Sequence, residues 1–225
     1  MIVSLVFVHI LSGALGLLAG FSILFSAKGS PSHKLVGRAF FCSMMILGLT
    51  GAIIGFARWI PLSALNGLLI CYFVLTSLLV IRRRGPNTRR YEWLLALVGS
   101  ILIVAYVVFG FEARGMPDGK LGGFPGMIYF VFAGITAVAV VGDGRYLRVS
   151  SPSGRGWVVR HLWRMFFPFF MAAAAFFLGQ AKLFPPAIQQ SASIFLPVVI
   201  VVGAMLFWSV QVGFATAWGR GKFSG

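Results

Sequence analysis

The sequence is 225 residues long, and 59% of its residues are hydrophobic while only 10% are charged. A soluble domain carries about 25% charged residues, so this composition excludes a soluble globular protein and indicates an integral membrane protein. The net charge of +15 would suit a nucleic-acid-binding protein, but the basic residues fall in short segments between apolar runs. Membrane topology and anionic lipid headgroups explain that pattern better, so we expect no nucleic-acid partner.

The chain contains about seven apolar runs, each long enough to cross a hydrocarbon core of about 30 Å. The fold class is therefore all-α and polytopic, because unpaired backbone groups are too costly in lipid and no alternating barrel pattern occurs. We expect one transmembrane helical domain over residues 1–225, with spans near 2–26, 39–57, 60–81, 93–111, 125–142, 162–181 and 194–218.

The Lys and Arg residues predict the orientation, since cytoplasmic loops carry an excess of them. All but four of the 19 lie on one side of the predicted spans, and the exceptions are Arg58, Arg114, Lys120 and Lys182. The N-terminus is therefore expected outside and the C-terminus in the cytoplasm, where the basic loops meet anionic lipid headgroups.

The first span carries a row of small residues beside one histidine. His9, Gly13, Gly16 and Gly20 are spaced by four, three and four residues, so they share one helix face. The glycines predict close packing against another helix, which includes a membrane-protein partner among the candidates. His9 lies about 10 Å below the outer surface, where an ionisable group is usually functional; the alternative is a hydrogen-bonded structural histidine.

Few polar residues share the outer half of the bilayer with His9. Asn66 falls in the third span and Glu112 ends the fourth, so His9, Asn66 and Glu112 form a candidate outer polar site. Such a set could hold a proton, a polar ligand or a quinone headgroup, or it could only satisfy helix ends.

The cytoplasmic side offers a richer set of polar residues. His161 and Arg164 are three residues apart and point the same way on a helix, and Asp143 is the natural counter-ion for an arginine or a charged histidine. The alternative is a set of orienting charges bathed in water and lipid phosphate. The candidate ligand-binding residues on this side are Lys28, His33, Arg38, Asp143, His161 and Arg164.

No pattern in the chain predicts catalysis. We expect neither catalytic residues nor a metal site, because one histidine and one acid do not supply the three or four ligands a metal usually needs. Haem requires two histidines at one depth, which only His33 and His161 satisfy. Quinone and haem both stay open as cofactors.

Two segments combine histidine, glycine and basic residues in a recognisable order. They are His9-x3-Gly13-x6-Gly20 followed by Lys28-Gly29-x3-His33-Lys34-x2-Gly37-Arg38, and Asp143-x-Arg145 followed by Arg160-His161-Leu162-x-Arg164-Met165. This pattern resembles a bacterial multi-pass inner-membrane family, one of the domains of unknown function. The resemblance implies a polytopic protein of the bacterial inner membrane and supplies no catalytic roles.

The leading hypothesis is a non-enzymatic membrane protein that binds a ligand or partner through its cytoplasmic basic and histidine residues. Three alternatives remain: a redox protein that binds quinone or haem, an accessory subunit of a larger membrane complex, and a small transporter. The transporter alternative depends on a short similarity between His33–Met45 and His161–Met171, which would make the two halves parallel repeats.

Overall fold

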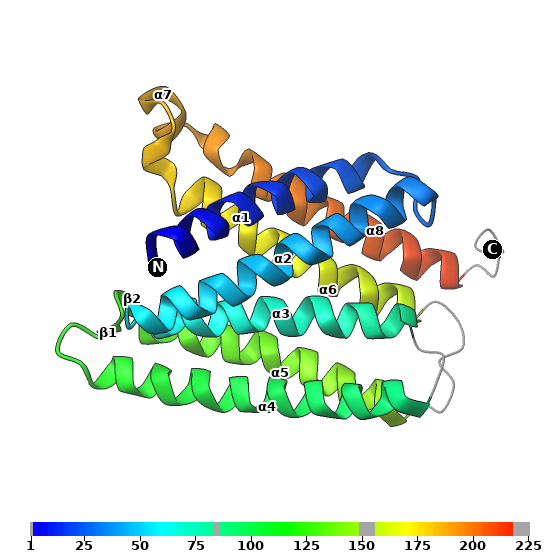
Figure 1. The fold of residues 1–225 in the computed structure, drawn as a ribbon, viewed down its shortest axis with the longest axis horizontal. Helices are drawn as coiled ribbons and strands as arrows, with labels where there is room; N and C mark the ends of the chain where they lie inside the picture. The colour runs from blue at the N-terminus through cyan, green and yellow to red at the C-terminus, as the bar shows by residue number, and fades with distance from the viewer. Residues whose placement is uncertain (1, 83–85, 149–155, 218–225) are drawn as a thin grey trace.

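The computed structural model describes residues 2–82, 86–148 and 156–217 (Figure 1). Of the helices it describes, seven are long and apolar enough to cross a membrane. The predicted all-α polytopic fold is confirmed, and the protein is a multi-pass integral membrane protein. The elements are α1 (Ile2–Phe25), α2 (Pro31–Ala57), α3 (Pro61–Arg82), α4 (Pro86–Gly115), β1 (Lys120–Leu121), β2 (Phe124–Pro125), α5 (Gly126–Arg148), α6 (Gly156–Ala173), the π-helix η1 (Ala174–Leu178), the 3-10 helix η2 (Ala181–Leu183), α7 (Pro186–Gln189), the 3-10 helix η3 (Ala192–Phe195) and α8 (Leu196–Ala217).

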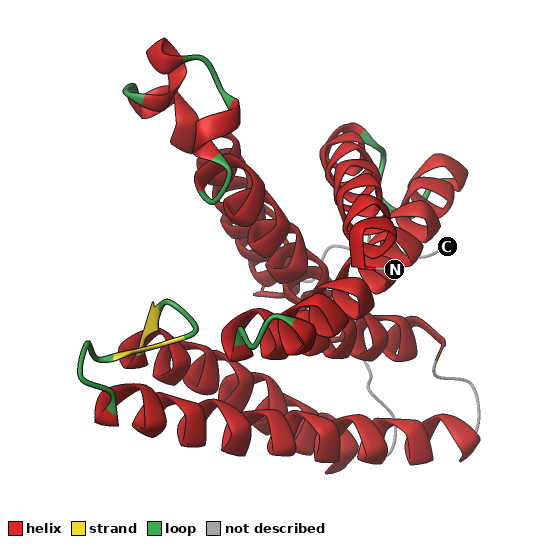
Figure 2. Cartoon of the chain, turned by 60° about the vertical axis from the view of Figure 1, so that its left-hand side comes forward, coloured by secondary structure: helices red, strands yellow, loops and turns green. Residues whose placement is uncertain are grey.

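Helix α3 lies at the centre and packs against α2, α4 and α6 (Figure 1, Figure 2). Helix α1 packs on α2, α5 on α4, and α8 on α6. Two apolar cores result, one around Met44 and Phe169 and the other around Tyr106. Helix α3 contributes neighbouring residues to both cores: Val74 belongs to the first and Phe73 to the second. The centre of α3 is therefore the seam between them.

The two ends of the bundle differ in charge. We call the end where α2, α4 and α6 begin and α1, α3 and α5 end the basic end, because most Lys and Arg residues of the sequence belong to it. The opposite end carries the antiparallel pair β1–β2 and the short helix α7 (Figure 1). That the basic end faces the cytoplasm stays a prediction.

The segment expected as a polar loop from Lys28 to Arg38 is mostly helical. Helix α2 begins at Pro31, eight residues before the predicted span. Ser30 caps it by accepting a hydrogen bond from the backbone N–H of His33, and Pro31 occupies the first turn, where its missing N–H costs nothing. His33 therefore lies on a helix, where we had expected a loop.

Other helices also pass the predicted limits at the basic end. Asp143 was expected just after a span, but α5 continues to Arg148, and α6 begins at Gly156, before His161. Hydropathy marks where the chain enters the hydrocarbon. The helix itself continues because its backbone bonds are still satisfied and Arg and Lys are good helix formers. At the other end, the hairpin β1–β2 lies between the predicted spans 93–111 and 125–142, and its last residue, Pro125, was expected to begin the second of them.

The glycine face of α1 packs inside the chain. A Cβ atom at Gly16 would lie 2.5 Å from the Met44 side chain of α2, and one at Gly20 would lie 2.5 Å from the Phe169 ring of α6. Close helix packing on this face is confirmed. Because α2 and α6 fill it, the face is not open to a second protein.

Candidate functional site at the basic end

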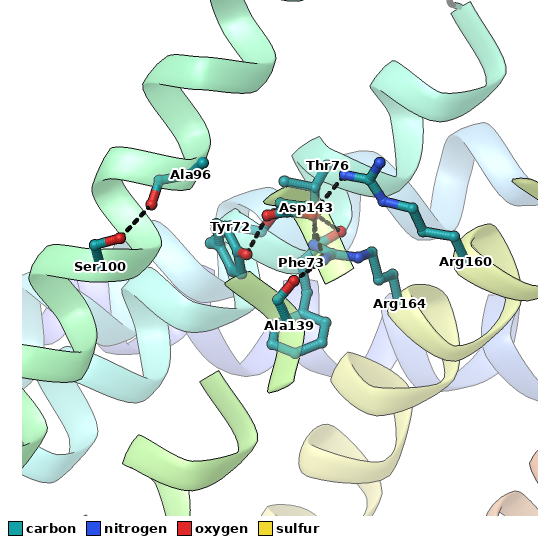
Figure 3. Close-up of polar contacts among 9 residues, drawn as sticks. All are labelled: Tyr72, Phe73, Thr76, Ala96, Ser100, Ala139, Asp143, Arg160 and Arg164. Carbon is teal, nitrogen blue, oxygen red and sulfur yellow. Dashed lines mark hydrogen bonds and ion pairs between the residues drawn. The ribbon is translucent and has the colours of Figure 1, made fainter. Parts of the chain in front are cut away.

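A buried carboxylate joins three helices near the basic end. Asp143 of α5 is 1% exposed, and its Oδ1 accepts hydrogen bonds of 2.5 Å from Nη2 of both Arg160 and Arg164 of α6 (Figure 3). Its Oδ2 accepts a bond of 2.5 Å from the hydroxyl of Tyr72 on α3. Asp143 was expected to pair with an arginine or a charged histidine, and here it pairs with two arginines. We call the four side chains the Asp143 network.

Arg164 is the most enclosed member of this network, with no exposed surface. Besides Asp143, its guanidinium donates to Oγ1 of Thr76 at 2.5 Å and to the carbonyl of Ala139 at 2.8 Å (Figure 3). Thr76 can accept because its own hydroxyl donates to the backbone carbonyl of Tyr72. The planar fork of arginine suits several acceptors held in fixed directions, so Arg164 links α3, α5 and α6.

Arg160 holds the edge of the network. Its guanidinium lies 3.9 Å from the ring centroid of Tyr146, a cation–π contact. Glu92 of α4 is 2% exposed and acts electrostatically on Arg160, as Asp143 does. Two buried cations, Arg160 and Arg164, are thus matched by two buried acids, which offsets part of the cost of placing charge in this region.

Two histidines lie beside the network. Nδ1 of His161 is 2.7 Å from Oγ of Ser77, a fully buried residue of α3. His33 of α2 is close enough to interact electrostatically with His161. A hydrogen bond at Nδ1 fixes the orientation of an imidazole and leaves Nε2 for another partner. The structure therefore brings together four of the predicted residues: His33, Asp143, His161 and Arg164.

Lys28 lies at the edge of this group, close enough to His33 to interact with it electrostatically, and Arg38 lies outside the group. Nζ of Lys28 donates to the carbonyl of Ile23 at 2.7 Å and lies 4.7 Å from the ring centroid of Trp208, so it caps α1 and ties that helix to α8. Burial lowers the pKa of Lys28 below its ordinary value. Arg38 is exposed on the surface of α2.

The three residues of the predicted outer polar site have separate surroundings. Nδ1 of His9 is 3.0 Å from Oγ1 of Thr50, Asn66 accepts a bond of 2.7 Å from the hydroxyl of Tyr106, and Glu112 is exposed. No hydrogen bond between described residues connects His9, Asn66 and Glu112. His9 and Asn66 are each satisfied by a neighbouring helix.

The sequence reasoning missed the contribution of α3. Tyr72, Thr76 and Ser77 supply three of the hydrogen-bonding side chains around Asp143, Arg164 and His161, yet they sit within an apolar span. The spacing of four between Tyr72 and Thr76 puts both on one helix face. This polar pair in an otherwise apolar span, toward the basic end, was the sequence feature that could have predicted their role.

The arrangement defines a class: a multi-pass membrane protein with a charged, hydrogen-bonded network buried among its helices. Comparisons of the chain with family models, curated proteins and solved structures find no match. The resemblance to a bacterial inner-membrane family stays a prediction.

Proposed function

We propose that this protein binds a small polar or lipidic ligand at its basic end, without converting it, between the Asp143 network and the His33–His161 pair. One observation carries the proposal. Within the described chain, four enclosed nitrogen atoms have no hydrogen-bond partner: Nε and Nη1 of Arg160, Nε of Arg164 and Nδ1 of His33. Unmet polar groups in an apolar environment cost several kcal/mol, so a ligand that supplies partners would be held there.

The charges around the site indicate what such a ligand carries. Asp143 and Glu92 already offset Arg160 and Arg164, so the ligand need not bring a full negative charge into the core. It needs hydrogen-bond acceptors, such as carbonyl, hydroxyl or phosphate oxygens, for the open guanidinium edges. The surrounding excess of basic residues favours a ligand that is anionic where it meets the solvent.

We also infer that the membrane is the bacterial inner membrane and that the basic end faces the cytoplasm. The distribution of Lys and Arg residues supports the orientation, and the resemblance of the His9–Arg38 and Asp143–Met165 segments supports the location. Tagging each terminus and testing its accessibility to a membrane-impermeant reagent in intact cells would check the orientation.

The ligand-binding proposal is tested by what the protein retains on purification. We expect native mass spectrometry of the wild type in mild detergent to show a non-covalent species. The double variant Arg160→Lys with His33→Ala should lose at least ninety percent of it, since Lys keeps the charge beside Asp143 but not the guanidinium edges. Lys34→Ala is the matched control, because Lys34 is an exposed neighbour of His33. A wild type without bound species, or equal retention by the double variant, would contradict the proposal.

A redox role is the second candidate, favoured by the His33–His161 pair. Histidines that bind haem or metal ions usually have their other ring nitrogen hydrogen-bonded, as Ser77 does for His161. The enclosed donors would equally suit the carbonyls of a quinone. A visible spectrum and a solvent extract of the purified protein decide this: a Soret band or an extracted quinone supports the role, and neither would remove it.

A further inference from the structure

A shallow groove runs along the outside of α5 and α6, ending at the basic end of the bundle. It lies on the outer surface of the bundle, where Val138 and Val141 are exposed, next to the Asp143 network. Its lining consists of Ala137, Val138, Val141, Gly142 and Arg145 of α5 and Trp163 of α6. The walls are apolar except for Arg145, which stands at the end nearest the helix terminus.

Glycine keeps the floor of the groove open. A Cβ atom at Gly142 would meet no other atom within 4 Å, and the same holds at Gly134. Gly134, Val138, Val141 and Arg145 are spaced by four, three and four residues, so they form one stripe along α5. From Gly134 to Arg145 this stripe rises about 16 Å, roughly half of a hydrocarbon core.

The opposite wall is held in place from behind. The Trp163 ring packs edge-to-face on Phe73 of α3, with centroids 5.1 Å apart. The guanidinium of Arg164 lies 5.3 Å from the Trp163 ring centroid. Because Arg164 is anchored in the Asp143 network, Trp163 is a fixed surface, and a molecule in the groove would lose little free energy in ordering it.

We propose that this groove binds one anionic phospholipid. An acyl chain lies against Val138, Val141 and Trp163, and the lipid phosphate pairs with Arg145. Val138 and Val141 are 67% and 56% exposed in the protein alone. An acyl chain of a bound lipid would cover both side chains. Arg145 is exposed at the end of the same stripe, where a guanidinium can bind a phosphate with two parallel hydrogen bonds.

The charge at the end of the groove argues against a second copy of the protein as the occupant. In a two-fold dimer within a membrane, the same patch of both copies meets at the same depth. The two Arg145 side chains would then face each other as like charges. An anionic lipid instead brings the opposite charge to the guanidinium and a flexible apolar chain to the open floor.

The test uses the full chain and two lipids with identical palmitoyl and oleoyl chains, phosphatidylglycerol and phosphatidylcholine, and counts bound lipids by native mass spectrometry. Arg145→Gln removes the phosphate contact, and its matched control is Arg148→Gln, an exposed arginine on the same helix outside the groove. Gly142→Leu fills the floor, and its control is Gly144→Leu, which has equal open space outside the groove. Ala137→Phe is a second filling variant, and thermal unfolding confirms which variants fold.

We expect the wild type to retain one phosphatidylglycerol in preference to phosphatidylcholine. Arg145→Gln should reduce that preference about fivefold, the effect of one cation at a membrane surface, and the filling variants should lose both lipids while the controls behave as wild type. Equal binding of the two lipids would overturn the proposal. So would an equal effect of Arg148→Gln, which would mean diffuse surface charge, or full binding by a folded filling variant, which would mean bulk lipid only.

This lipid site stands apart from the proposed ligand site. The variants that test the groove leave Arg160 and His33 unchanged, and the variants that test the ligand leave Arg145 and Gly142 unchanged. Failure of one proposal therefore does not produce failure of the other.

Discussion

The basic end and the opposite half of the bundle handle buried polar groups differently. In the opposite half they occur as neutral pairs between two helices, His9 with Thr50 and Asn66 with Tyr106. Near the basic end, Asp143 holds together three helices through charged bonds. A neutral group in lipid needs only hydrogen-bond partners, whereas a buried charge needs an opposite charge as well. The size of each polar cluster follows from that difference.

Both regions nevertheless use threonine in the same way. Thr50 donates its hydroxyl to the carbonyl of Ile46 in its own helix and contacts His9. Thr76 donates to the carbonyl of Tyr72 and accepts from Arg164. In each case a carbonyl of the same helix accepts the hydrogen bond that the hydroxyl donates, which leaves the hydroxyl oxygen as an acceptor for a neighbouring helix. The partner's charge, not the threonine, distinguishes the two regions.

The comparison is tested most strongly at Asp143. Asp143→Asn keeps the shape of the side chain but leaves two guanidinium groups without their shared counter-ion. We expect a loss of about 3–5 kcal/mol in the free energy of unfolding, measured by denaturant titration in detergent. Asp118→Asn is the control, because Asp118 is an exposed turn residue that accepts one backbone bond. A loss below about 1 kcal/mol for Asp143→Asn would show that the network is not a structural anchor.

The two arginines should differ in importance. Arg164 is fully buried and bonded to Thr76, Ala139 and Asp143, whereas Arg160 has one ion pair and a stacking contact. We expect Arg164→Met to reduce the free energy of unfolding by about 2 kcal/mol more than Arg160→Met, since it leaves more buried acceptors unmet. Thermal unfolding of both variants in one detergent measures the difference, and equal losses would contradict the assigned order.

Lys28 offers a smaller test at the membrane surface. Lys28→Met removes the cap of α1 and the contact with Trp208, and we expect a loss of about 1 kcal/mol near neutral pH. Because burial lowers the folded-state pKa of Lys28 below the ordinary 10.5, the unfolded chain binds more protons between those two values. The folded wild type therefore gains stability as pH rises through that window.

The pH dependence is measured as the difference in unfolding free energy between wild type and Lys28→Met at a series of pH values. We expect this difference to grow as pH approaches 10.5 from below. A difference that shrinks over that range would show that the charged amine, not the neutral one, is favoured in the folded chain.

The smallest effect is expected for the neutral pair in the opposite half. A double-mutant cycle with His9→Ala and Thr50→Val should give a coupling free energy of about 0.6 kcal/mol, the average for hydrogen bonds between membrane helices. A coupling as large as that of a buried ion pair would show that His9 carries a charge in the folded protein. The distinction between the two regions would then fail.

The fold was largely predictable because hydropathy reports on the one constraint that a bilayer imposes on every span. The helix ends at the basic end were not, since Ser30 and Pro31 start α2 well outside the apolar run. Capping geometry and helix propensity decide where such a helix ends. These local effects operate outside the hydrocarbon, so hydropathy does not report them. The earlier start of α2 matters for the site, because it places His33 on a helix.

The site was predictable where charge decided it. Few acids lie among the many basic residues on that side, so Asp143 was expected to be the counter-ion of an arginine or a charged histidine. Which basic residue it meets was not predicted. The part played by Tyr72 and Thr76 depends on how α3 is rotated against α6, which a single sequence does not report. Grouping His9 with Asn66 used depth alone, and depth does not say which neighbouring helix each side chain meets.

Helix α6 has a consequence for how the protein is made. The candidate span that contains it, Gly156–Leu178, has a mean hydropathy of 1.4 over its most apolar window, the lowest among the seven candidate spans. Helix α6 itself carries two arginines, Arg160 and Arg164. An arginine near the middle of an isolated span costs about 2.5–3.5 kcal/mol to insert, though less near the surface. Asp143 precedes these arginines in the chain and is synthesised first. With α5 inserted first, its carboxylate is available as a counter-ion when α6 enters, so the order of helices along the chain lowers the cost of inserting α6.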